Sequence, residues 1–318
     1  MYKILLVGAG EIGSRYLQGL AKLKENIEIT VIDPNKNSLK TAKSRWKEVA
    51  INQNKVHKIE WFTDFQNHKN VDLAIIATSS KNRDIIVKKV LDVFNPKYWI
   101  IEKVLAQSKK QIDSILKVTN KSMGAWVNTP RRIYEWHKKI FYNFNIKGPL
   151  KVEKIGGLWG IACNSIHFID LVSWWTKEDL ISIDVSKLEK NWFRSNRDGY
   201  FETTGKIKAN FSNGSELVLK SFNYLNDEHI KVYLPNKNEI LINEHDGFAI
   251  SSNGQKLTGR CELQSNLTTP LIKKLLLENK CSLPTLKFSS KQHKIFLEGI
   301  LFHWNDCQKL NDTKVPIT

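Results

Sequence analysis

Short apolar runs separated by amphipathic segments make up the first part of the chain. The run at 71–77 is almost continuously apolar, as is typical of a strand that is buried on both faces of a parallel sheet. The segments 84–94 and 108–120 carry apolar residues at helical spacing. Strands that alternate with helices predict a doubly wound parallel sheet up to about residue 125. The expected strands are 3–7, 27–32, 58–62, 71–77, 98–101 and 125–128.

The second part of the chain has strand-like segments without regular helices between them. The Asn-Gly pairs at 213–214 and 253–254 are hairpin-turn signals, and one apolar helix is expected at 166–175. The tail 289–310 is again helical, and we expect it to pack back on the rest. We therefore predict an α/β chain: a Rossmann domain at 1–125, then at 126–318 an α+β domain with a large, open, mainly antiparallel sheet. The expected strands of this domain are 151–160, 181–188, 205–211, 216–222, 230–234 and 239–242.

A glycine-rich turn follows the first predicted strand and precedes a helix. In the sequence Gly8-Ala-Gly10-Glu-Ile-Gly13, the three glycines stand at the spacing of a dinucleotide-binding fingerprint. Gly8 permits a tight turn, Gly10 lets the backbone approach a pyrophosphate, and Gly13 allows close packing of the helix on the strand. Glu11 and Ile12 complete this expected cofactor loop. The alternative is a glycine turn in an unrelated α/β protein.

Asp33 ends the second predicted strand, twenty residues after Gly13. An acidic group at this place accepts hydrogen bonds from the adenosine ribose hydroxyls, which favours NAD over NADP. Lys36 is close in sequence and softens that preference, so NADP stays open. Without a cofactor, Asp33 would be a helix cap.

Polar residues follow three of the predicted parallel strands, namely Thr78, Lys103 and Asn128. Ligands of doubly wound sheets bind beyond the carboxyl ends of the strands, so we expect these side chains at the site. Lys103 can donate a hydrogen bond to a substrate oxygen during hydride transfer, with Glu102 orienting it or touching the ribose. The alternative is a surface ion pair.

Two further groups of residues in the second domain are candidates for proton transfer and for substrate binding. Asn164 and His167 share a helical face, and His167 titrates in the range that suits proton transfer at neutral pH. Asp170 can fix its tautomer or serve a structural role, and a buried structural histidine is the alternative. The adjacent Arg131 and Arg132 suit an anionic substrate group, or else form a solvated basic turn.

The composition excludes several classes of protein. The 318 residues carry a net charge of +17, but lysines are spread along the whole chain without a dense basic tract. We therefore expect no nucleic-acid partner, whereas a basic surface attracts phosphorylated or carboxylated metabolites. No apolar run is long enough to cross a membrane, and we identify no signal peptide. The four cysteines match neither a zinc site nor a disulfide framework, so we expect no metal and a cytoplasmic location.

Taken together, these features resemble the Gfo/Idh/MocA family of NAD(P)-dependent sugar oxidoreductases. The matching segments are VGAGEIGSR, AIIATSS, IIEKVLAQS and IHFIDLVSWW, in the family's order over most of the chain. The resemblance implies a Rossmann domain, a second domain with a large open sheet, and assembly into homodimers or homotetramers. It implies that Thr78 and Ser79 line the cofactor cleft, that Glu102 lies by the nicotinamide, that Lys103 is the catalytic lysine and that His167 is the acid/base.

Two positions depart from the family pattern. The family has a proline after the lysine, and its peptide bond is often cis. Val104 takes that position here, so the sequence does not decide whether the backbone after Lys103 has the same conformation. Four residues before the histidine, where many members have an aspartate, stands Cys163, so the proton relay must differ. The expected reaction is hydride transfer between NAD and a sugar carbinol, with Asn128, Arg131, Arg132, Asn164 and His167 contacting an anionic or nucleotide-linked sugar. The competing hypothesis is a catalytically inactive NAD-binding sensor.

Overall fold

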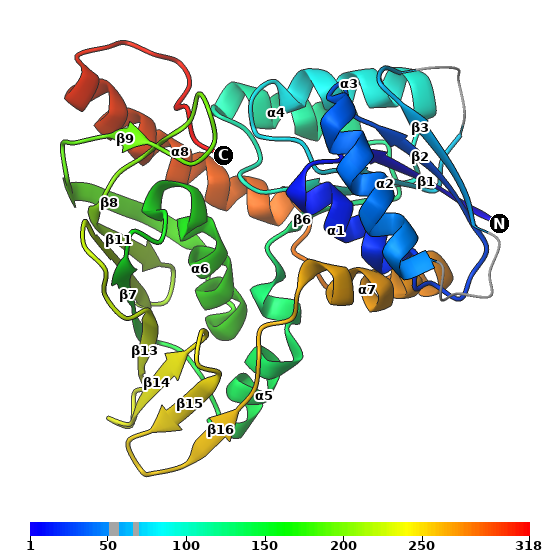
Figure 1. The fold of residues 1–318 in the computed structure, drawn as a ribbon. Helices are drawn as coiled ribbons and strands as arrows, with labels where there is room; N and C mark the ends of the chain where they lie inside the picture. The colour runs from blue at the N-terminus through cyan, green and yellow to red at the C-terminus, as the bar shows by residue number, and fades with distance from the viewer. Residues whose placement is uncertain (51–56, 66–69) are drawn as a thin grey trace. The chain divides into compact units, whose positions relative to one another are not determined.

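The computed structural model describes residues 1–50, 57–65 and 70–318, which form two compact units. The first unit comprises 1–105, 111–128 and 262–286, and the second comprises 106–110, 129–261 and 287–318. The chain therefore passes between the units several times, whereas the sequence analysis placed one boundary near residue 125. Figure 1 shows the course of the chain through both units.

The first unit is built on a six-stranded, wholly parallel sheet in the order β3-β2-β1-β4-β5-β6. Its central strands are buried at nearly every position, which is why they appear in the sequence as continuous apolar runs. The doubly wound fold class is confirmed. The strands are β1 (Tyr2–Val7), β2 (Ile27–Ile32), β3 (Lys58–Phe62), β4 (Leu73–Ile76), β5 (Tyr98–Glu102) and β6 (Gly124–Asn128).

The helices of this unit connect successive strands, with one exception. Helix α7 (Gln264–Glu278) comes late in the chain but lies beside α1 (Figure 1), where Thr269 donates its hydroxyl to the Gly19 carbonyl at 2.7 Å. The sequence analysis did not predict α7, which contains Pro270, a residue that usually breaks helices. The connecting helices are α1 (Glu11–Leu20), α2 (Lys36–Ala50), α3 (Arg83–Phe94) and α4 (Lys109–Thr119).

The second unit contains an eight-stranded sheet in the order β16-β15-β14-β13-β7-β12-β11-β8. All neighbouring pairs are antiparallel except β7 and β12, so the predicted mainly antiparallel sheet is confirmed. Both Asn-Gly pairs lie in hairpin turns, between β11 and β12 and between β15 and β16. The strands are β7 (Lys151–Gly157), β8 (Leu180–Leu188), β11 (Gly205–Phe211), β12 (Glu216–Phe222), β13 (His229–Tyr233), β14 (Glu239–Asn243), β15 (Phe248–Ser251) and β16 (Lys256–Thr258).

Two long helices accompany this sheet. Helix α6 (Ile161–Thr176) contacts β12, and its wholly buried Ile166 and Ile169 explain its apolar sequence. Helix α8 (Leu286–Gln308) packs against β8 so closely that a Cβ on Gly299 would lie 2.5 Å from the side chain of Ile183. The remaining elements are the 3-10 helix η1 (Pro130–Ile133), helix α5 (Glu135–Asn143) and the short strands β9 (Phe193–Arg194) and β10 (Phe201–Glu202).

Candidate functional site

The glycine turn after β1 is tightly packed at two of its three glycines. Gly8 has φ +95°, and a Cβ there would lie 2.8 Å from the Ala77 carbonyl carbon. A Cβ on Gly13 would lie 1.9 Å from the Gly8 carbonyl oxygen. Both positions therefore require glycine so that α1 can start directly against the ends of β1 and β4.

Gly10 differs from these two glycines because no atom of the residues that the structure describes lies within 4 Å of the place its Cβ would take. It is the N-cap residue of α1, and no side chain caps the helix there. The open space in front of a helix N-terminus, with its unpaired N–H groups and partial positive charge, fits a phosphate group. This is the property expected of a dinucleotide pyrophosphate cradle. Ile12 lies in the first turn of the same helix.

Glu11, also in the first turn of α1, is engaged by a neighbouring helix. Arg45 of α2 donates to both Glu11 carboxylate oxygens, at 2.9 and 3.0 Å, and to the Ser14 hydroxyl at 2.6 Å. The hydrogen bond from Arg45 lowers the pKa of Glu11. The pair connects the first turn of α1 to α2, a contact that the sequence analysis did not anticipate.

Asp33 lies beside the glycine turn at the end of β2. Its Oδ2 accepts the Ala9 N–H at 2.7 Å and its Oδ1 accepts the Asn35 N–H at 2.8 Å. The side chain is buried, so these backbone donors hold it in one place. Each carboxylate oxygen can accept a further hydrogen bond, which leaves Asp33 able to receive ribose hydroxyls.

Glu102 and Lys103 follow at the end of β5. Glu102 is buried, and its Oε1 accepts the Tyr16 hydroxyl at 2.9 Å and the Asn128 amide at 2.6 Å. Burial raises the pKa of Glu102, although Asn128, Tyr16, Arg83 and Lys103 oppose the shift. Glu102 is thus an internal carboxylate and not half of a surface ion pair.

The Lys103–Val104 peptide bond is cis, the geometry that the resemblance associates with a proline after the lysine.

Asn128, at the end of the neighbouring strand β6, donates the amide hydrogen bond to the Glu102 carboxylate. Its amide nitrogen also donates to Gln264 Oε1 at 2.9 Å, while its buried Oδ1 accepts no hydrogen bond from the residues that the structure describes. Asn128 therefore supports Glu102, a role that the sequence analysis did not assign to it.

The loop after β4 contains Thr78 and Ser79. Thr78 packs its backbone on Gly8, and its buried hydroxyl makes no hydrogen bond within the described parts of the chain. Arg83, which begins α3, donates to the carbonyl oxygens of Thr78, Glu102 and Val104. The expected cofactor residues of the first unit thus lie at the carboxyl ends of adjacent parallel strands, as the topology requires.

In the second unit, Asn164 and His167 lie one turn apart on α6. The Asn164 amide donates to the Trp159 carbonyl at 2.8 Å. At the start of α6, the buried Glu202 accepts the N–H groups of Ala162 and Cys163 at 2.8 and 3.0 Å. A carboxylate is therefore present at this helix end beside Cys163, but it comes from β10. The sequence analysis missed it because Glu202 is distant in the chain.

The two adjacent arginines are both engaged in ion pairs. Arg131 Nε and Nη2 contact the two Glu244 carboxylate oxygens at 3.0 and 2.8 Å, and His137 Nε2 lies 2.8 Å from Glu244 Oε1. Arg132 contacts both oxygens of the fully buried Asp170, at 2.8 and 2.5 Å. These carboxylates compensate much of the positive charge that the sequence suggested for an anionic substrate.

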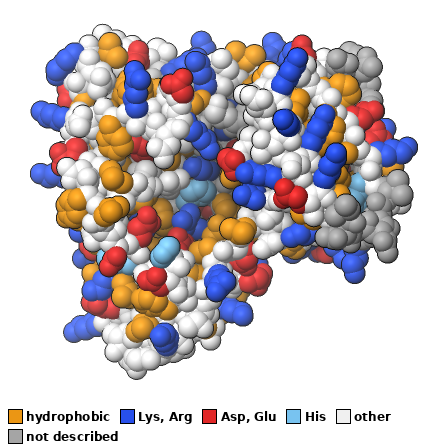
Figure 2. Space-filling model, in the orientation of Figure 1, with side chains coloured by type: hydrophobic (Ala, Val, Ile, Leu, Met, Phe, Trp, Pro, Cys, Tyr) orange, Lys and Arg blue, Asp and Glu red, His pale blue; other side chains and the backbone are white. Residues whose placement is uncertain are grey.

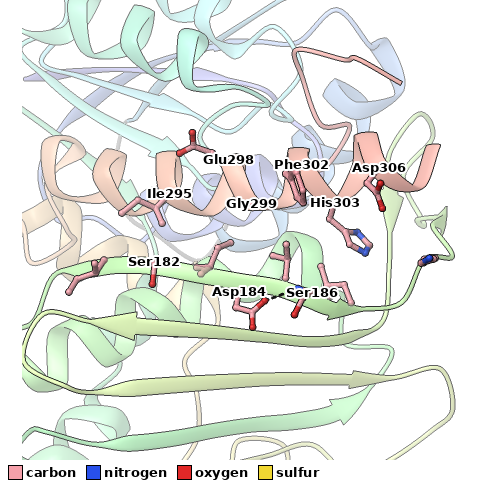
Figure 3. Close-up of a pocket in the computed structure, with 14 residues that line it drawn as sticks. Ser182, Asp184, Ser186, Ile295, Glu298, Gly299, Phe302, His303 and Asp306 are labelled. Atoms are coloured by element: carbon pink, nitrogen blue, oxygen red, sulfur yellow. Dashed lines mark hydrogen bonds between the residues drawn. The ribbon is translucent and has the colours of Figure 1, made fainter. Parts of the chain in front are cut away.

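A groove of about 660 Å³ lies elsewhere in the second unit, between β8 and α8. Figure 3 shows His303 of α8 directed toward β8, whereas the side chains of Ser182, Asp184 and Ser186 point away from the helix. None of the residues that line it belongs to the site predicted from the sequence.

The surface charges are dispersed. Figure 2 shows Lys and Arg side chains over the whole visible face, interspersed with Asp and Glu. This agrees with the even distribution of lysines along the sequence. Among the residues that the structure describes, no helix is long and apolar enough to cross a membrane.

The first unit also matches a known sequence family. Residues 4–120 match the sequence model of the TrkA-N domain, which has a Rossmann-like fold. No curated protein matches the chain.

Solved structures match almost the whole chain. UDP-N-acetylglucosamine 3-dehydrogenase GnnA from Acidithiobacillus ferrooxidans superposes with a TM-score of 0.71 at 10% identity, over 96% of this chain and 99% of that one. The scyllo-inositol dehydrogenase of Lactobacillus casei, solved with bound NAD(H) and scyllo-inositol, gives 0.68 at 14% identity, over 96% and 97%. The myo-inositol 2-dehydrogenase of Lactobacillus plantarum gives 0.67 at 17% identity, over 96% and 97%. The chain therefore has the two-domain fold of the Gfo/Idh/MocA-type dehydrogenases.

Proposed function

We propose that the protein is an NAD(P)-dependent oxidoreductase that transfers a hydride between the nicotinamide and a hydroxyl or keto carbon of a sugar or polyol. The observation that carries this proposal is the glycine turn, in which Gly8 and Gly13 are packed tight while Gly10 faces open space. Asp33 is fixed beside that turn, and Lys103 follows the end of β5 in the same parallel sheet. The fold shared with sugar and polyol dehydrogenases supports the same function.

The residues of the first unit bind and orient the cofactor in this proposal. The N–H groups at the start of α1 hold the pyrophosphate, and Asp33 accepts the ribose hydroxyls, which favours NAD. Thr78, Ser79 and Glu102 line the cleft near the nicotinamide end. When bound, the nicotinamide accepts or donates the hydride.

Lys103 and His167 are the groups that stabilise the substrate oxygen and exchange its proton. The Lys103 ammonium donates a hydrogen bond to the substrate oxygen and stabilises the negative charge that develops there. His167 exchanges the carbinol proton, with Asn164 next to it on α6. The aspartate that commonly assists this histidine is replaced by Cys163, which cannot act as a carboxylate.

The finer part of the proposal is an anionic or nucleotide-linked sugar as the substrate. The net charge of +17 supports it, because a basic surface raises the local concentration of anions. Arg131 and Arg132 support it less than their sequence suggests, since each is paired with a carboxylate.

A catalytically inactive NAD-binding sensor is the second candidate. Cys163 in place of the assisting aspartate favours it, because the loss of a proton relay is a way for an enzyme to lose its chemistry. The presence of both Lys103 and His167 favours the enzyme.

The test begins with absorbance and fluorescence measurements for NAD(H) on the freshly purified protein. Neutral polyols, sugar acids and nucleotide sugars are then added in turn, and oxidation or reduction of the cofactor is followed. We expect turnover with at least one of them, and a loss of about 10²–10⁴-fold in Lys103→Met. Lys117→Met, which changes an exposed lysine of α4, should retain wild-type turnover.

Three outcomes distinguish the alternatives. Turnover that requires Lys103 supports the enzyme. Tight NADH binding without turnover for any compound supports the sensor. Turnover with neutral polyols alone contradicts the anionic substrate class.

A further inference from the structure

Arg83 is a charged side chain in the interior of the first unit, with 1% of its surface exposed. A buried guanidinium is costly unless its N–H groups are hydrogen-bonded. Here they meet backbone carbonyl oxygens that belong to two different strand ends. The side chain therefore connects the ends of these two strands by hydrogen bonds, in addition to filling space in the interior.

Two of these carbonyl oxygens lie on either side of Lys103. Nη1 of Arg83 donates to the Glu102 carbonyl at 2.7 Å and also to the Val104 carbonyl. One guanidinium nitrogen thus holds the residues before and after the lysine. The backbone from which the Lys103 side chain extends is fixed at both ends.

The other end of the guanidinium connects this segment to the loop after β4, which contains Thr78. Nη2 of Arg83 donates to the Thr78 carbonyl. The Thr78 backbone nitrogen is itself packed on the glycine turn, 2.9 Å from the place that a Cβ on Gly8 would take. Arg83 therefore bridges the segment around Lys103 and the loop that rests on the pyrophosphate cradle.

We propose that Arg83 is the positioning residue of the catalytic lysine, holding Lys103 in register with the loop after β4 through the carbonyl groups of Glu102, Val104 and Thr78. The inference rests on the proposed function of Lys103. The planar fork of an arginine spans several acceptors in fixed geometry, whereas a lysine ammonium presents a single point charge. The positive charge of Arg83 also favours the carboxylate form of the neighbouring Glu102.

The test compares Arg83→Lys and Arg83→Ala with the wild type, using Arg197→Met as the control at an exposed arginine of the second unit. A misplacement of about 1 Å lowers turnover about 10²-fold, so we expect kcat to fall about tenfold in Arg83→Lys and about a hundredfold in Arg83→Ala. The KM for the sugar and the Kd for NADH should stay within about threefold of wild type, because Arg83 is proposed to position Lys103 and not to bind either ligand. Millimolar guanidinium should restore part of the kcat of Arg83→Ala.

A merely structural role would give a different pattern. Thermal stability, NADH affinity and kcat would then decline together, and guanidinium would restore nothing; that result, or an unchanged kcat in Arg83→Ala, overturns the proposal.

Amide hydrogen exchange at Lys103 and Val104 provides a readout that does not depend on turnover. If the wild type binds NADH but shows no hydride transfer, the proposed function fails, and with it the catalytic part of the inference. Faster exchange at Lys103 and Val104 in Arg83→Lys, with unchanged exchange in β5, still supports the positioning contact. Unchanged exchange at both residues overturns it.

Discussion

Oδ2 of Asp33 accepts the N–H of Ala9 at 2.7 Å, which joins the end of β2 to the glycine turn after β1. The residue expected to select the cofactor therefore also shapes the loop expected to hold the pyrophosphate. Substitution of Asp33 should affect both the choice between NAD and NADP and the affinity for either one.

Asp33→Asn should weaken NAD binding about tenfold, because an amide offers one acceptor oxygen where the carboxylate offers two, and no negative charge. NADP should lose less affinity, since the 2′-phosphate is no longer repelled, so the ratio of the two dissociation constants shifts toward NADP. Calorimetric titration with both cofactors measures this ratio. Asp92→Asn, at an exposed position of α3, is the control. An unchanged ratio would remove Asp33 from the account of cofactor choice.

Glu102→Gln tests the buried carboxylate. Burial raises the pKa of Glu102 above its ordinary value of 4.5, so the native state binds this proton more tightly than the unfolded state. Wild-type stability should therefore decline as the pH rises from 4.5 through the raised pKa, and this contribution should be absent in the variant. Denaturant unfolding at a series of pH values measures the difference in free energy of unfolding between the two proteins. A difference that does not change with pH would show that Glu102 is not shifted upward.

Glu244→Gln tests the opposite case. Burial opposes ionisation of Glu244, but the charge of Arg131 and the contact with His137 hold its pKa well below 4.5. The ionised pair should therefore contribute stability above pH 4.5, and this contribution should be lost as the pH falls through the lowered pKa. We expect Glu244→Gln to cost about 2–3 kcal/mol at pH 7, and less in acid. Glu189→Gln, at an exposed residue of the second unit, should cost almost nothing at either pH. Equal costs for Glu244→Gln at pH 7 and pH 3 would contradict the assignment.

Much of the fold follows from local patterns in the sequence. The strands of the parallel sheet, six of the eight strands of the second sheet, the two Asn-Gly hairpins and the glycine turn each occupy a few consecutive residues, and hydrophobic periodicity detects such segments. The short strands β15 and β16 were not predicted. Helix α7 does not follow from a local pattern. Its Pro270 predicts a break, and only its packing on α1, through the contact of Thr269 with Gly19, makes it part of the first unit.

The residues of the candidate site likewise fall into those that a local sequence pattern identifies and those that it does not. Gly10, Asp33 and Lys103 are recognisable because their spacing to predicted strands is fixed by the fold. Arg83, Tyr16 and Glu202 are not recognisable, because their partners lie far away in the sequence, as with the 86 residues between Tyr16 and Glu102. The sequence pair Arg131-Arg132 suggests free positive charge, and only the structure shows the carboxylates that compensate it.

The measurement that tests the central claim most directly is NADH titration of Gly10→Ala, followed by fluorescence, beside the wild type. Within the described ranges of the chain, the added methyl group meets no atom within 4 Å, and the φ of −64° suits alanine. The stability should therefore change by no more than about 1 kcal/mol. The methyl group occupies the space through which the backbone approaches the pyrophosphate, so the Kd for NADH should rise at least about tenfold. Equal NADH affinity in the two proteins, or a wild type that binds no NADH, would contradict a dinucleotide cradle at this turn.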